Sequence, residues 1–137
     1  MKVKFKIKER LVSLRLLNQN KGLKIEDINR VSADAEKLQV TKEEWKEVDR
    51  KDYINGEEIT DKNRIALTKK YAEKIAKNEI NQATQWSDEK DKEKEIELTE
   101  PTINLLKGAI KEKEDKGELG IDSDSVSISK INEQIKG

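Results

Sequence analysis

The sequence predicts an α+β fold, with four to five helices packed on a small, mainly antiparallel sheet. At the N-terminus, Val3, Phe5 and Ile7 alternate with lysines, which is typical of a strand with one buried face. Most later segments instead space their apolar residues as amphipathic helices do. Asn55 and Gly56 lie between two short runs and suit the tight turn of a β-hairpin, because both residues tolerate positive φ angles.

The composition favours one folded domain over residues 1–137. A chain of this length is typical of a single domain and can bury a core without disulfides or metals. Charged residues make up 42% of the chain and apolar residues 33%, yet the net charge is zero. Low hydrophobicity favours disorder mainly when the net charge is large, so we expect a folded chain with a modest core.

The chain lacks both Cys and His. The absence of thiols excludes disulfides, cysteine catalysis and thiolate zinc sites, and the absence of imidazole removes the commonest general base and transition-metal ligand. We therefore predict that the protein is not an enzyme and has no catalytic, cofactor-binding or metal-binding residues. No apolar run approaches the length of a membrane span, and the N-terminus lacks a signal-peptide pattern, so we expect no membrane contact and a cytoplasmic location.

Two helices are predicted in the N-terminal third of the chain. The first begins near Ile7 and ends at Asn18–Gly22, where Gly22 can take the left-handed conformation. The second has an apolar stripe, and its polar residues, Asp34 among them, are expected to face water. The stripe consists of Ile25, Ile28, Val31, Ala35 and Leu38.

The strongest local signal in the sequence is a capping box, with Thr41 at the cap and Glu44 three residues later. Val40 and Trp45 occupy the two positions of a hydrophobic staple around that cap. A short helix is therefore predicted to begin at Thr41, followed by the hairpin over Tyr53–Ile59.

The C-terminal half is predicted to contain helices and one short strand. Residues 61–85 form one long polar helix, residues 87–94 a charged loop, and residues 95–98 a strand. Thr99 precedes a helix that should end at Gly117, and Ser127 or Ser129 caps a last short helix.

The two predicted strands at the chain's extremes have complementary charges. Lysines occupy one face of the first strand, and Glu95 and Glu97 occupy one face of the strand over 95–98. Opposite charges that face each other across a sheet are mildly stabilising. We therefore expect these strands to be neighbours, with Lys4 and Glu97 on one sheet.

A basic cluster at the N-terminus is a candidate nucleic-acid contact. Phosphates could bind its cations and a base could stack on Phe5. The favoured interpretation is an edge strand that lysines protect from aggregation, with Phe5 pointing into the core. The cluster consists of Lys2, Lys4, Lys6, Lys8, Arg10 and Arg15.

Two other motifs are weaker. Residues 11–38 have the helix-turn-helix outline, but Glu26 and Asp27 open the second helix and would repel phosphates, so a plain helical hairpin is favoured. Asp122 and Asp124 are close in sequence, but the glycine and the closing glutamate of a calcium loop are missing.

The two tryptophans are the candidate protein-contact residues. Exposed tryptophans often anchor interfaces. Trp45 is expected to be at least half buried by its staple, whereas Trp86 follows a polar helix and precedes a charged loop. Trp86 is therefore the best single candidate, with Trp45 second.

Several segments together resemble a group of small, uncharacterised bacteriophage and prophage proteins. They are Lys8–Leu17 (KERLVSLRLL), Gln85–Ser87 (QWS), Glu93–Leu98 (EKEIEL), Leu105–Glu112 (LLKGAIKE) and Gly117–Leu119 (GEL), about half the chain. The motifs are structural rather than catalytic, and no functional residues carry over. The chain departs from that group in the helical stretch 61–85, which looks like an insertion. The resemblance implies a phage-type origin, in the host cytoplasm, and a protein that binds another protein.

The sequence therefore favours a non-enzymatic phage-type protein that acts by protein–protein interaction, in assembly or in interference with a host factor. The alternative is a nucleic-acid-binding module that uses the basic N-terminal face. Nucleic acid is the less favoured partner, and the sequence leaves a homo-oligomer open.

Overall fold

The computed structural model describes residues 1–19 and 22–136 and has an α+β fold, as predicted. Its strands form two small antiparallel sheets, one of two strands and one of three. The sequence predicted one domain, whereas the structure divides into two compact units. The first unit is Met1–Val40 with Lys92–Gly137, and the second unit is Thr41–Asp91.

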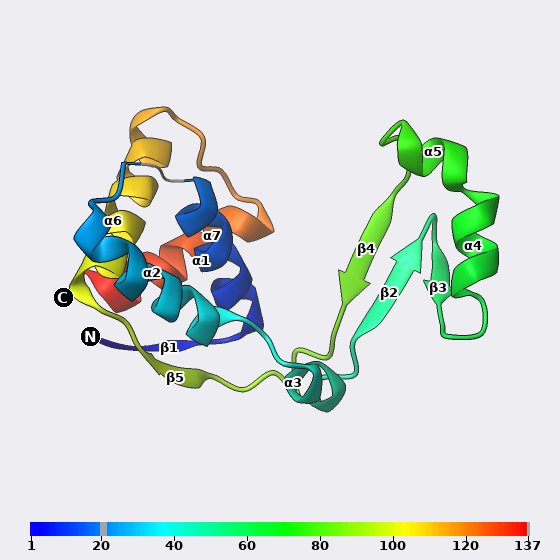
Figure 1. The fold of residues 1–137 in the computed structure, drawn as a ribbon, viewed down its shortest axis with the longest axis horizontal. Coiled ribbons are helices and arrows are strands. Elements are labelled where there is room, and N and C mark those ends of the chain that lie inside the picture. The colour runs from blue at the N-terminus through cyan, green and yellow to red at the C-terminus, as the bar shows by residue number, and fades with distance from the viewer. Residues whose placement is uncertain (20–21, 137) are drawn as a thin grey trace. The chain divides into compact units, whose positions relative to one another are not determined.

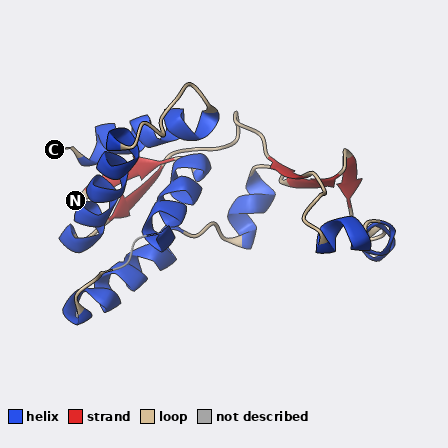
Figure 2. Ribbon diagram, turned by 90° about the horizontal axis from the view of Figure 1, so that it is seen from above, coloured by secondary structure: helices blue, strands red, loops and turns tan. Residues whose placement is uncertain are grey.

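The first unit consists of four helices and a pair of strands (Figures 1 and 2). All four helices contribute buried residues to one hydrophobic cluster with the strands, in which Val3, Phe5 and Ile96 are the strand members. The elements are β1 (Lys2–Phe5), α1 (Ile7–Gln19), α2 (Ile25–Leu38), β5 (Lys94–Glu97), α6 (Glu100–Asp115) and α7 (Ser123–Ile135).

The expected pairing of β1 with β5 is confirmed. The strands are antiparallel, with Lys2 opposite Glu97 and Lys4 opposite Glu95. The ammonium group of Lys2 lies 3.6 Å from the Glu95 carboxylate, on the exposed face. The other face buries the apolar residues, so the alternation in the sequence does separate the core from water.

Helix ends in this unit follow the sequence signals in part. α6 ends as predicted at Gly117, whose φ is 68° and whose N–H donates to the Glu114 carbonyl, a Schellman arrangement. α7 begins earlier than predicted, because the Asp122 side chain accepts from the Ser125 N–H and caps the helix in place of Ser127 or Ser129. The predicted exit of α1 at 18–22 includes residues 20–21, which lie outside the described residues.

Arg10 is buried, which corrects its assignment as a nucleic-acid contact. Its side chain is 1% exposed and lies against the end of α2. Arg10 Nε donates to the Leu38 carbonyl at 3.1 Å, and a terminal guanidinium nitrogen donates to the Gln39 carbonyl. The last carbonyls of a helix have no partner within the helix. Arg10 therefore satisfies carbonyls that α2 itself leaves free.

Asp34 is also buried, although the sequence pattern predicted that it faces water. Its Oδ2 accepts hydrogen bonds from the Thr99 N–H at 2.8 Å, the Thr99 hydroxyl at 2.6 Å and the Thr102 hydroxyl at 2.5 Å. Thr99 is the N-cap residue of α6, and its own side chain makes no cap bond. An aspartate of α2 thus takes over part of the capping role at the start of α6.

The surroundings of Asp34 hold it in the charged form. Burial alone would raise the pKa of its carboxyl group, but the hydrogen bonds from Thr102 and Thr99, together with the nearby Lys37 ammonium, outweigh burial and lower that pKa. Lys37 Nζ lies 3.6 Å from Asp34 Oδ1.

The apolar stripe of α2 is buried only in its C-terminal part. Val31 and Leu38 belong to the core, whereas Ile25 is 88% exposed and Ile28 is 44% exposed. Period alone predicts which residues share a helix face, but it does not predict how far along the helix the neighbouring elements reach.

The second unit is built on a three-stranded antiparallel sheet in the order β3–β2–β4. Val48, Ile54 and Leu67 are its buried apolar residues. The predicted hairpin is confirmed, with φ angles of 49° at Asn55 and 83° at Gly56. The elements are α3 (Lys42–Glu47), β2 (Lys51–Ile54), β3 (Glu57–Ile59), α4 (Arg64–Lys70), α5 (Ala72–Ala76) and β4 (Gln82–Gln85).

The prediction of one helix over residues 61–85 is wrong. The helical part is divided into α4 and α5, and it ends where Asn78 takes a φ of 55°. The Asn78 N–H donates to the Ile75 carbonyl and the Glu79 N–H to the Lys74 carbonyl, which completes a Schellman motif. The chain then returns as β4 and pairs with β2, an interaction that local sequence patterns do not report.

We predict that Arg10→Met destabilises the first unit far more than Arg15→Met. Loss of Arg10 leaves two helix carbonyls without their donor, at a cost of about 2–3 kcal/mol. Arg15 is an exposed partner of Asp124, and such pairs contribute about 1 kcal/mol or less. Urea unfolding followed by far-UV circular dichroism measures both, and equal losses would contradict the capping role.

We further predict that Asp34→Asn lowers the free energy of unfolding at neutral pH by about 1–3 kcal/mol, because the charged acceptor is lost. The folded-state pKa of Asp34 is lowered, so its contribution is complete above its ordinary pKa of 3.8 and disappears as the pH falls through the folded-state value. The stability difference between the wild type and the variant should therefore shrink below about pH 4.

Urea unfolding at a series of pH values measures this difference. Glu36→Gln, at an exposed position of the same helix, is the matched control and should leave the unfolding curve unchanged. A difference between Asp34→Asn and the wild type that is constant down to about pH 3 would show that the charge is not involved.

Candidate functional site

The structure brings the two predicted contact residues, Trp45 and Trp86, together. Their ring centroids lie 5.4 Å apart, with an angle of 65° between the planes, an edge-to-face arrangement. Both side chains are half-buried. Trp45 belongs to α3, and Trp86 follows β4, where the Ser87 N–H donates to the Val48 carbonyl at 2.7 Å. The expectation that Trp45 is at least half buried agrees with its position.

Hydrogen bonds at both ends of α3 fix the position of Trp45. The predicted capping box at Thr41 is present, because the Glu44 N–H donates to Thr41 Oγ1 and the Thr41 N–H donates to Glu44 Oε1, each at 3.1 Å. At the other end of α3, Asp49 has a φ of 54°, and the Arg50 N–H donates to the Trp45 carbonyl at 3.1 Å. This Schellman arrangement turns the chain back, so that Arg50 lies beside Trp45.

Arg50 covers the ring of Trp45. Its guanidinium carbon lies 4.5 Å from the ring centroid, within the range of a cation–π interaction. Arg50 Nε also donates to Asp52 Oδ1 at 3.1 Å, and the Thr84 hydroxyl donates to the same oxygen at 2.8 Å. Burial would raise the pKa of Asp52, but the hydrogen bonds from Thr84 and Arg50 lower it, so the carboxylate stays charged and orients the guanidinium. We call Trp45, Trp86 and Arg50 the tryptophan cluster.

Two acidic residues complete the surroundings of the cluster. Trp86 Nε1 donates to Asp91 Oδ2 at 3.2 Å, and Asp91 is 5% exposed. Asp49 forms an ion pair of 2.5 Å with Lys90, whose hydrogen bond and charge lower the pKa of the Asp49 carboxyl group. Trp86 is thus fixed by Asp91 and Trp45 by Arg50, in addition to the contact between the two rings.

A shallow hollow of about 560 Å³ opens beside the cluster. One indole, three cations and two carboxylates surround it. The lining residues are Lys42, Trp45, Lys46, Asp49, Arg50 and Asp52. An aromatic surface with cations around it is suited to binding, since it offers apolar area, donors and positive charge.

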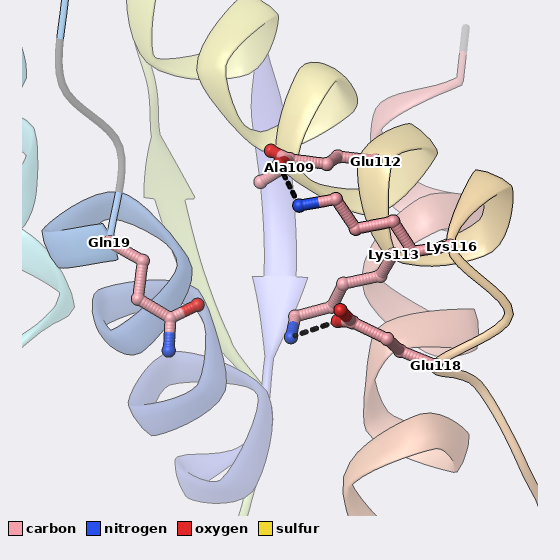
Figure 3. A pocket seen from close by; sticks show the side chains of 6 residues that line it. All are labelled: Gln19, Ala109, Glu112, Lys113, Lys116 and Glu118. Atoms are coloured by element: carbon pink, nitrogen blue, oxygen red, sulfur yellow. Dashed lines mark hydrogen bonds and ion pairs between the residues drawn. The ribbon is translucent and has the colours of Figure 1, made fainter.

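A second hollow, of about 330 Å³, lies in the first unit (Figure 3). Its charged side chains pair with one another, since Lys116 Nζ lies 2.6 Å from Glu112 Oε1 and Lys113 Nζ lies 3.5 Å from Glu118 Oε2. The first pair lowers the pKa of Glu112 and raises that of Lys116. Charges that neutralise one another locally leave little to attract a ligand, so this hollow is a weaker candidate.

Several of the basic N-terminal residues are buried or paired with carboxylates. Lys8 and Arg15 both form ion pairs of 2.7 Å with Asp124, and their hydrogen bonds lower the pKa of that carboxyl group. Lys2 lies near Glu95, and Arg10 is buried. Lys4 is exposed on β1, and Lys6 is half-buried beside it. Phe5 is buried, as the favoured interpretation expected, so it is not available to stack on a base.

Within the described residues, no three acidic, histidine or cysteine side chains come together as metal ligands would. None of the helices over residues 1–19 and 22–136 combines the length and the apolar character needed to cross a membrane.

The sequence reasoning missed Arg50 and Asp91, which hold the two indoles. The signal for Arg50 was present, since an aspartate that follows a short helix tolerates the left-handed conformation and reverses the chain. The contact between Trp86 and Trp45 had no local signal, because it depends on the pairing of β4 with β2.

Comparisons with known proteins give no further guidance on the site. No family model, no curated protein and no solved structure matches this chain. The resemblance to phage proteins therefore stays a prediction.

We predict that Trp86→Phe destabilises the second unit by about 1–3 kcal/mol, because the hydrogen bond to the Asp91 carboxylate is lost. The chain contains two tryptophans, so Trp45 becomes the single indole and its fluorescence reports this unit alone. Urea unfolding followed by Trp45 emission measures the loss. An exposed substitution in the same unit, Lys62→Gln, is the control, and an unchanged midpoint for Trp86→Phe would contradict the structural role of the pair.

Proposed function

We propose that this protein is a non-enzymatic binding protein that contacts another protein through the tryptophan cluster of its second unit. The single observation that supports this proposal is the edge-to-face pair of Trp45 and Trp86 with Arg50 over one ring. Tryptophan and arginine are among the residues that most often dominate the binding energy of protein interfaces.

The cluster is favoured because it is ordered before any partner binds. Arg50 is oriented by Asp52 and Trp86 by Asp91, so neither side chain has to be immobilised on association. Ordering a mobile side chain at an interface costs about 0.5–1.5 kcal/mol. Fixed indoles that remain partly exposed therefore suit recognition of a partner.

The nucleic-acid alternative has less support. Of its six residues, Arg10 is buried, and Lys8 and Arg15 both pair with the carboxylate of Asp124. Non-specific affinity for nucleic acid depends on cations that are free to neutralise phosphates.

A phage-type role, in assembly or in interference with a host factor, follows only from the resemblance and is part of the proposal. The neighbouring genes provide the test. Tail or capsid genes beside this one would favour assembly, a group of small early genes would favour interference, and a bacterial operon with neither would contradict a phage-type role.

Photo-crosslinking tests the proposed surface. Benzoylphenylalanine at Gln85, an exposed residue next to Trp86, should crosslink a specific protein in lysate of the cells that naturally express the gene. The same probe at Lys69, exposed on α4 of the same unit, should give no such product. An excess of unlabelled wild-type protein should remove the Gln85 product, whereas folded Trp45→Ala should not. Equal crosslinking at both positions, or competition by Trp45→Ala, would exclude the tryptophan cluster as the contact.

A further inference from the structure

The hollow beside Trp45 has an excess of positive charge. Its two carboxylates are already paired, Asp49 with Lys90 and Asp52 with Arg50. The remaining two lining cations, Lys42 and Lys46, form no ion pair with any residue in 1–19 or 22–136. Two ammonium groups at the hollow are therefore left to a ligand.

The two lysines lie on one side of Trp45 on α3. At 100° per residue, Lys42 and Lys46 lie about 60° and 100° around the helix from Trp45, in the same direction. Glu43 lies three residues before Lys46, yet the two form no ion pair in the part of the chain that the structure describes. Glu44 is engaged in the capping box. These carboxylates thus do not pair with the lysines of the hollow.

Trp45 adds an apolar surface beside the two lysines. Arg50 covers one face of its ring and Trp86 meets the ring in an edge-to-face arrangement, yet the side chain remains partly exposed. The methylene stems of lysines extend such a surface while the charged ends stay in water. An apolar surface with cations beside it is complementary to a chain segment that carries an apolar side chain next to carboxylates.

We propose that this hollow binds an acidic peptide segment of the partner protein, with carboxylates at Lys42 and Lys46 and an apolar side chain on the exposed part of Trp45. The inference rests on the proposed function, because it names the chemistry of the partner at the same surface. Charge complementarity is the argument for this occupant.

Tryptophan fluorescence with defined peptides tests the proposal. The probe is a short, end-capped peptide of equal numbers of glutamates and leucines, and the comparison peptide has glutamine in place of glutamate. We expect the acidic peptide to change the emission and to bind at least about tenfold more tightly than the glutamine peptide, with affinity that falls as salt rises. Equal affinity for the two peptides, or none for the acidic one, would overturn the proposal.

A matched pair of double variants locates the binding. The double variant Lys42→Glu, Lys46→Glu should lower the affinity for the acidic peptide by about tenfold or more, because repulsion replaces attraction. Lys62→Glu with Lys69→Glu makes the same charge change at exposed positions outside the hollow and should leave the affinity within about twofold. Equal weakening by both pairs would show that net charge, and not the hollow, attracts the peptide.

The outcomes separate this inference from the proposed function. If the Gln85 probe crosslinks a partner but the acidic peptide does not bind, the acidic segment is wrong and the contact surface stands. If the peptide binds at the hollow but no partner is crosslinked, the contact surface is wrong as the protein's function. Oligothymidylate is the remaining comparison. If it binds more tightly than the acidic peptide, and if Lys42→Glu with Lys46→Glu abolishes that binding, the ligand is a single-stranded nucleic acid and the inference is overturned.

Discussion

The packing of the helices in the first unit depends on two buried charged residues, Asp34 and Arg10. Asp34 of α2 accepts three hydrogen bonds at the start of α6, and Arg10 of α1 donates to the carbonyls at the end of α2. Each charge compensates backbone groups that a helix end cannot satisfy itself. The helices are therefore joined through their ends as well as through their apolar faces, and burial of either charge is tolerable only while its partners stay in place.

This arrangement suits a chain in which 42% of the residues are charged and only 33% are apolar. A small apolar core constrains the orientation of its side chains only weakly, since the hydrophobic effect is not directional. Hydrogen bonds to a charged group are both directional and strong. Thr99 and Thr102 can reach Asp34 only when α6 starts at one position relative to α2, so the polar contact defines a register that the modest core alone would leave less well defined.

Local patterns predicted the parts of the fold that depend on neighbouring residues. The hairpin at Asn55 and Gly56, the capping box at Thr41 and the end of α6 at Gly117 all follow from backbone preferences of a few residues. The pairing of β1 with β5 was also predictable, because lysines and glutamates alternate in a complementary way.

The same reasoning failed where a residue's role depends on distant elements. Arg10 and Asp34 are charged residues on amphipathic helices, and the ordinary expectation for such residues is water. No pattern within α1 reports that the end of α2 will lie beside Arg10. The helix expected over 61–85 failed for a related reason, since residues 82–85 are polar and become a strand only through pairing with β2. The tryptophans were identified by residue type, but their contact could not be.

In the second unit, the same two tryptophans form the candidate site and stabilise the fold. Val48, Ile54 and Leu67 are its buried apolar residues, and aromatic pairs contribute about 0.5–1.5 kcal/mol beyond the area they bury. Trp45 and Trp86 therefore serve as part of the core as well as part of the surface. A partner that covers the remaining exposed area of the indoles would complete that core. Binding would then stabilise the second unit itself, because a ligand that binds only the folded state shifts the folding equilibrium toward it.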